Sequence, residues 1–146
     1  MKLLSYLLLV IAVLSCEIRP QPINYGSDLC HWCKMSIVDS QHAGQIVTEK
    51  GKSFKYDAVE CMLNHLKQWD QTTPKLYLVT TFDGPGELIA AAEAHYLISP
   101  TIPSPMGEFL TAFEDDGTRQ KHGSTEESVL LDWQQLQQEF EVDPVP

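Results

Sequence analysis

The sequence lacks the short motifs that identify many enzyme classes. It contains no G-x-S-x-G nucleophile elbow, no phosphate-binding glycine-rich loop and no H-E-x-x-H zinc motif. Its five histidines are scattered, and no pair of carboxylates stands out as an acid–base set. The motifs therefore give no support to hydrolysis, phosphoryl transfer or zinc-dependent catalysis.

Basic residues are also scarce. The chain has 10 Lys and Arg against 20 Asp and Glu, which gives a formal net charge of −10 at pH 7. Nucleic acids are bound through Lys and Arg at their phosphates, so this acidic chain is a poor candidate for nucleic-acid binding. Acidity otherwise favours solubility and disfavours binding to anionic surfaces.

Long apolar runs are confined to the N-terminus. An apolar stretch over residues 3–14 follows Lys2 and ends just before Cys16. It is shorter than the roughly 20 residues that a transmembrane helix needs, and it has the form of a secretion signal. Residues 13–16, VLSC, resemble a bacterial lipoprotein cleavage box, in which the Cys becomes the lipidated first residue.

We therefore predict a lipoprotein signal peptide over residues 1–15, lipidation of Cys16 and a flexible tether over residues 16–28. The mature protein would be a membrane-anchored lipoprotein of the cell envelope, facing the periplasm or the exterior. The alternative is an ordinary signal peptide that is cut nearby, which would leave Cys16 without a lipid.

Residue patterning in the first half predicts strand, strand, helix, strand. Residues 43–48 and 53–56 read as strands, and residues 35–38 form a further β-compatible run. A helix follows, with Asp57 as its cap and Glu60 completing a capping-box pattern. Its apolar stripe consists of Val59, Met62, Leu63, Leu66 and Trp69. Residues 76–81 read as the third strand.

The second half is predicted to repeat this order. Strands are expected at residues 95–99, 107–113 and 128–131, a short helix at 115–122, and a last helix capped by Asp132, while residues 88–94 fit either helix or strand. We therefore predict an α+β domain over residues 29–142. It would consist of two small ββαβ units, about 29–82 and 83–142, followed by a frayed tail at 143–146.

The strongest candidate for a functional site is the segment of residues 30–35, CHWCKM. Three sulfur side chains, those of Cys30, Cys33 and Met35, occur within six residues. Thiolate and thioether donors together select Cu(I). Cys33 and Met35 would point the same way if the segment were extended, and Lys34 would favour the thiolate of Cys33.

Two other interpretations of Cys30 and Cys33 remain open at this point. A C-x-x-C pair in an oxidising compartment can form a structural disulfide, or it can be the centre of a thiol–disulfide oxidoreductase. A structural zinc site would need four donors, and there is no second C-x-x-C. A redox motif of the thioredoxin type should follow a strand and begin a helix, which this segment does not.

Other donors lie further along the chain. Cys61 and His65 are four residues apart on the predicted helix and form a possible metal pair. Both lie off the apolar stripe, so we favour a boundary Cys and a solvated His. Met106 lies in PSPMG (103–107), a stiff loop where no apolar stripe explains it.

The order and spacing of these motifs resemble the NosL family, the copper chaperones of nitrous oxide reductase maturation. The resemblance rests on Cys16, Cys30-x-x-Cys33-x-Met35, Gly51-Lys52, residues 54–62 (FKYDAVECM), Ala94-His95-Tyr96-Leu97, Ser104-Pro105-Met106-Gly107 and Val129-Leu130-Leu131. It covers nearly all of the chain after the signal peptide.

The resemblance implies a lipoprotein that binds one Cu(I) and gives it to the machinery that assembles the copper centres of nitrous oxide reductase, without being an enzyme. It implies a fold similar to part of organomercurial lyase. It assigns Cys33, Met35 and Met106 as copper ligands, and leaves Cys30 and His31 as weaker candidates. Two positions depart from the family pattern: Lys34 stands where many relatives have Gly, and Ala58 stands where they have a second Asp.

Overall fold

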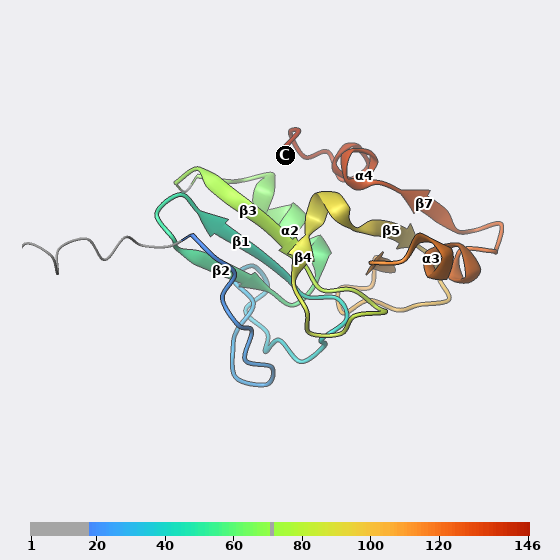
Figure 1. The fold of residues 1–146 in the computed structure, drawn as a ribbon, viewed down its shortest axis with the longest axis horizontal. Helices are drawn as coiled ribbons and strands as arrows, with labels where there is room; N and C mark the ends of the chain where they lie inside the picture. The colour runs from blue at the N-terminus through green and yellow to red at the C-terminus, as the bar shows by residue number, and fades with distance from the viewer. Residues whose placement is uncertain (1–17, 71) are drawn as a thin grey trace, which may run out of the picture.

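The computed structural model describes residues 18–70 and 72–146, so the predicted signal peptide and Cys16 lie outside the described residues (Figure 1). The first elements are β1 (Gly44–Thr48), β2 (Ser53–Tyr56), α2 (Val59–Leu66), β3 (Pro74–Val79) and β4 (Ile89–Ala90). The remaining elements are the 3-10 helix η2 (Ala91–Glu93), β5 (His95–Ile98), β6 (Leu110–Phe113), α3 (Asp116–His122), β7 (Val129–Leu131) and α4 (Trp133–Glu139).

The order strand, strand, helix, strand occurs twice, which confirms the α+β fold with two ββαβ units. The first sheet has the order β2-β1-β3-β4 and the second has the order β6-β5-β7; all pairs are antiparallel. Residues 88–94, which fitted either helix or strand, contain both β4 and η2. Since Leu78 pairs with Ala90, the first sheet extends into the chain that was assigned to the second unit.

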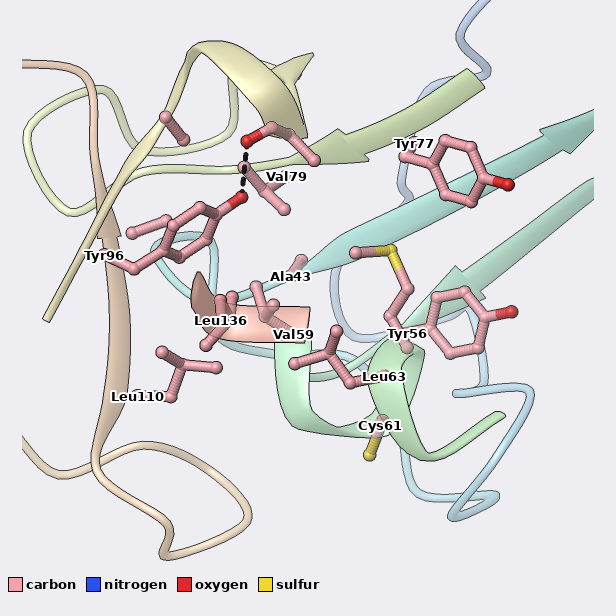
Figure 2. Close-up of a cluster of buried hydrophobic side chains, with 14 of the residues drawn as sticks. Ala43, Tyr56, Val59, Cys61, Leu63, Tyr77, Val79, Tyr96, Leu110 and Leu136 are labelled. Atoms are coloured by element: carbon pink, nitrogen blue, oxygen red, sulfur yellow. Dashed lines mark hydrogen bonds between the residues drawn. The ribbon is translucent and has the colours of Figure 1, made fainter. Parts of the chain in front are cut away.

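One core joins the two sheets. Val59 and Leu63 on α2 lie beside Leu110 of β6 and Leu136 of α4, and all four side chains are almost fully buried (Figure 2). Tyr96 is also buried there, and its hydroxyl donates a hydrogen bond to the carbonyl of Ala91 at 2.7 Å. The two halves therefore pack as one unit, which fixes α2 between them.

The start of α2 differs from the prediction. Its N-cap is Ala58, which offers no side-chain hydrogen bond, so the predicted capping by Asp57 is wrong. Glu60 does not complete a capping box either, because its carboxylate accepts a hydrogen bond from the hydroxyl of Ser104. By contrast, Asp132 caps α4 as predicted, and it also forms a complete capping box with Gln135.

Both terminal segments are more ordered than predicted. The tether prediction is wrong from residue 21 onward, because the buried amide of Gln45 exchanges hydrogen bonds of 2.8 and 2.7 Å with the backbone of Gln21. The frayed-tail prediction is also wrong. Gln137 hydrogen-bonds the backbone of Val145, and the indole of Trp133 donates to the carbonyl of Pro146 at 3.1 Å.

Among the described residues, none of the helices combines the length and the apolar character that crossing a membrane requires.

Candidate metal site

The C-x-x-C motif lies in a closed loop, residues 28–37, that we call the cysteine loop. Its ends are joined by a bridge between Leu29 and Ser36 and by a hydrogen bond from the Cys30 amide to the Met35 carbonyl at 2.8 Å. Between them the chain turns, and Lys34 adopts a left-handed φ of 65°. The segment is therefore not extended, so the condition under which Cys33 and Met35 would point the same way is not met. Residues 35–38 form an isolated bridge and loop hydrogen bonds, not a strand of a sheet.

The cysteine loop covers the side of α2 that carries Cys61 and His65. The amide of His31 donates to the carbonyl of Lys55 on β2 at 2.8 Å, and the rings of His31 and His65 lie 4.8 Å apart. Cys61 is 0% exposed and His65 is 7% exposed. The prediction of a boundary Cys and a solvated His is therefore wrong, because the loop buries this second side of the helix.

Three cysteine sulfurs meet where the loop contacts the helix. The Sγ atoms of Cys30, Cys33 and Cys61 all lie within 4.8 Å of one another, and all three residues are free cysteines. Cys30 and Cys61 are buried, whereas Cys33 is partly exposed. We call these three residues the sulfur cluster. Within the described part of the chain, no His or carboxylate belongs to it.

Sequence reasoning did not assign Cys61 to the site. The available signal was its four-residue spacing from His65, which places both on one side of the helix. Figure 2 shows the Cys61 sulfur projecting from α2 away from the side chain of Leu63. An apolar stripe identifies only the side of a helix that packs on the hydrophobic core, so it gave no indication of the second buried side.

The cluster favours a thiolate at Cys30. A hydrogen bond from the Cys61 thiol is the largest influence and lowers the pKa of Cys30 to about 4, against the opposing effect of burial. Backbone N–H groups of Asp57, Cys33 and Trp32 lower it further. The pKa of Cys61 is raised, first because its thiol donates to Cys30 and then because it is buried.

The pKa of the Cys33 thiol is raised, whereas Lys34 was expected to favour its thiolate. Burial raises its pKa, and the nearby charge of Cys30 raises it too. The ammonium group of Lys34 donates a hydrogen bond to the carbonyl of His31. Before metal binds, Cys30 is therefore the sulfur best placed to carry the charge, while the assignment of Cys33 as the anionic copper ligand stays a prediction.

The other predicted ligands, Met35, Met106 and His31, differ in how deeply they are buried. Met35 is 49% exposed. Met106 is half-buried in a loop that packs against the same core, and this loop is attached to α2 by the bond between Ser104 and Glu60. His31 packs edge-on against Phe54, with ring centroids 4.7 Å apart, and burial lowers the pKa of its imidazole. The structure thus brings Cys30 and Cys33 together with Cys61.

Comparisons with known proteins agree on one family. The family model described as NosL matches residues 22–140. The crystal structure of the copper chaperone NosL from Shewanella denitrificans has a similar fold, with a TM-score of 0.68 and 17% sequence identity. That likeness covers 80% of this chain and 93% of the solved one. Among curated proteins, no sequence matches this chain.

Proposed function

Since the chain belongs to the NosL family, we propose that it binds copper as Cu(I) and delivers it to the machinery that assembles the copper centres of nitrous oxide reductase. The observation that carries this proposal is the sulfur cluster, whose three Sγ atoms lie within 4.8 Å of one another. Its similarity in fold to a copper chaperone supports the same assignment. The protein is then a metal carrier and not an enzyme.

The donor set favours Cu(I) over zinc. Thiolates and thioethers are soft ligands, which match Cu(I), whereas a structural zinc site needs four donors of the Cys and His type. The cluster offers three thiols and no imidazole or carboxylate among the described residues. Met35, on the same loop, adds a neutral and more weakly bound thioether.

Delivery would occur by ligand exchange at the exposed side of the cluster. Cys33 and Met35, with Met106 as the third donor, form the ligand set that we propose for handover. Because the site is partly exposed and has few ligands, a partner protein can replace these ligands on the copper ion one at a time. Leu29 and Val38, at the two ends of the cysteine loop, are 60% and 68% exposed, and such exposed apolar side chains suit contact with an acceptor protein.

An anaerobic Cu(I) titration of the reduced protein tests the metal assignment. We expect one Cu(I) per chain by native mass spectrometry and a preference for Cu(I) over Zn(II) in direct competition. Met62→Leu is the matched control, because it removes a buried sulfur that packs against Gly44 and leaves all three cysteines of the cluster in place. Zn(II) binding as tight as Cu(I) binding would contradict the proposal.

Delivery needs a separate test in cells that make nitrous oxide reductase. We expect Cys33→Ser to lower the copper content of the isolated reductase, while the protein itself is still produced. Fully loaded reductase in cells that contain only the Cys33→Ser protein would contradict the proposed destination of the metal.

A thiol–disulfide oxidoreductase that uses Cys30 and Cys33 is the second candidate. The C-x-x-C motif favours it, but Cys30 is 1% exposed and the motif lies in a loop, not at a helix start. An attacking thiolate must reach the disulfide of its substrate. We therefore expect no catalysed reduction of insulin, and measurable turnover that depends on Cys30 would favour the enzyme.

We also propose that the protein is a lipoprotein of the cell envelope, anchored through Cys16. The support is the apolar stretch over residues 3–14 that ends next to a lipoprotein cleavage box. Cys16→Ala should abolish incorporation of a labelled fatty acid and leave an unprocessed precursor. Label retained on that variant would exclude Cys16 as the lipidated residue.

A further inference from the structure

We propose that Cys30 and Cys61 form an inner copper position, separate from the outer one at Cys33 and Met35. This inference rests on the proposed copper-binding function and identifies where the ion is held between uptake and delivery. Cys33 borders both positions and would pass the ion between them.

The argument begins with the depth of the sulfurs. Cys30 and Cys61 are 1% and 0% exposed, whereas Met35 is 49% exposed. Cys33 lies between these extremes and within 4.8 Å of both buried sulfurs. The three neighbouring cysteine sulfurs therefore differ in depth, and a single ligand set at the surface would leave the two buried sulfurs without a role.

The inner position is built from two separate elements. Cys30 comes from the cysteine loop and Cys61 from α2, and the loop is attached to β2 by the hydrogen bond from His31 to Lys55. The rings of His31, Trp32 and His65 pack beside the cluster, with centroid distances of 4.8 Å between the histidines and 6.0 Å from Trp32 to His65. The burial of Cys30 and Cys61 limits the access of water and of competing ligands to the inner sulfurs.

Copper entry can be written as a balanced exchange. Cu(I) exchanges its bonds to Met35 and then Cys33 for bonds to the sulfurs of Cys30 and Cys61; the two outer sulfurs are released, and the proton shared between Cys30 and Cys61 leaves to solvent. One positive charge replaces another, so the net charge of the buried sulfurs is unchanged. Because burying an additional charge would be costly, this balance makes the inner position compatible with its burial.

Two positions of different depth suit a carrier. The outer donors are accessible, so they can take the ion from a source and give it to an acceptor. The inner donors are covered, so an ion held there exchanges slowly with small thiols in the surroundings. Removing the inner donors should therefore weaken retention while leaving some uptake at Cys33 and Met35.

X-ray absorption on the unmutated full chain tests the position of the ion without any substitution. The protein is labelled with selenomethionine and loaded with one equivalent of Cu(I). We expect sulfur neighbours at the copper edge and no copper neighbour at the selenium edge. A copper neighbour of selenium at this loading would overturn the inference, because it would place the resting ion on Met35 or Met106.

Substitution of Cys61 gives a second, independent test. Cys61→Ala should lower Cu(I) affinity by about tenfold or more and speed transfer to a competing chelator. Met62→Leu is the matched control, since Met62 is the buried neighbour of Cys61 and packs its thioether against Gly44; we expect no change in either measurement.

A folded Cys61→Ala protein with the affinity and transfer rate of the wild type would overturn the inference. The melting temperature of the copper-free variant establishes that it is folded, and the selenium-edge measurement decides the question if it is not. Failure of the unmutated chain to bind Cu(I) at all would instead contradict the proposed function.

Discussion

The hydroxyl of Ser104 donates a hydrogen bond to the carboxylate of Glu60, the residue that precedes Cys61 on α2. Glu60 is 0% exposed, and burial raises the pKa of its carboxyl group. The contact joins the loop of Met106, in the second half, to the helix that carries a cysteine of the cluster. It therefore couples the two halves at the edge of the candidate metal site.

Ser104→Ala should destabilise the protein, because it leaves a buried carboxyl oxygen of Glu60 without this donor and the amide of Phe109 without its acceptor. We expect a loss of about 1–3 kcal/mol in the free energy of unfolding, measured by urea denaturation. Ser124→Ala is the control: the Ser124 hydroxyl bonds an exposed backbone carbonyl, so its removal should change stability by less than about 0.5 kcal/mol. Equal losses in the free energy of unfolding would show that the buried Ser104 hydroxyl contributes no more to stability than the exposed hydroxyl of Ser124.

A second contact between the halves involves buried His42. Its Nε2 lies 3.2 Å from the hydroxyl of Thr111 on β6, and its Nδ1 lies 2.9 Å from Asp39. Thr111→Val keeps the shape of the side chain and leaves one ring nitrogen unpaired, so unfolding should become easier by about 1–3 kcal/mol. Thr73→Val, at an exposed position, should have little effect in the same denaturation experiment.

The left-handed backbone at Lys34 explains why Gly suits this position in the family. A side chain at φ 65° is strained, and Lys34→Gly should raise the free energy of unfolding by about 0.5–1 kcal/mol after the larger backbone entropy of Gly is included. Gly51 has a similar φ of 75°, so the reverse change there, Gly51→Ala, should destabilise the protein. Since an added Cβ there meets nothing within 4 Å, its effect reports the backbone alone.

Deleting residues 144–146 should lower the melting temperature, because it removes hydrogen bonds to Gln137 and to the indole of Trp133. The expected loss is about 1–3 kcal/mol. In a Gln137→Leu background the same deletion should cost less, since the partner is already absent. An unchanged melting temperature on deletion in the wild type would mean that the tail contributes nothing to stability.

Local signals in the sequence identified most of the elements. The strand at Ser53–Tyr56 and the helix at Asp116–His122 lie where alternation and turn residues indicated them. The cap of α4 at Asp132 was also correctly located, and the capping box that it forms with Gln135 is complete within four consecutive residues. Such features depend on neighbours in sequence and need no knowledge of the fold.

Features that depend on distant partners were missed. Asp57 was predicted to cap α2, but the helix begins one residue later, and the Asp57 amide instead contributes to lowering the pKa of Cys30. The burial of Cys61 depends on a loop some thirty residues earlier in the chain. The ordering of residues 21–28 likewise depends on Gln45, a buried polar residue that no local pattern connects to the N-terminal segment.

The position of Cys30 and Cys61 on separate elements has a consequence for the carrier as a whole. A metal ion bound by both is a removable cross-link that closes a loop between residues 30 and 61. A covalent link closing ~30 residues reduces the entropy of the unfolded chain by an amount worth about 4 kcal/mol at room temperature. Release of the ion would open this link, so we expect proteases to degrade the empty protein more readily than the loaded one.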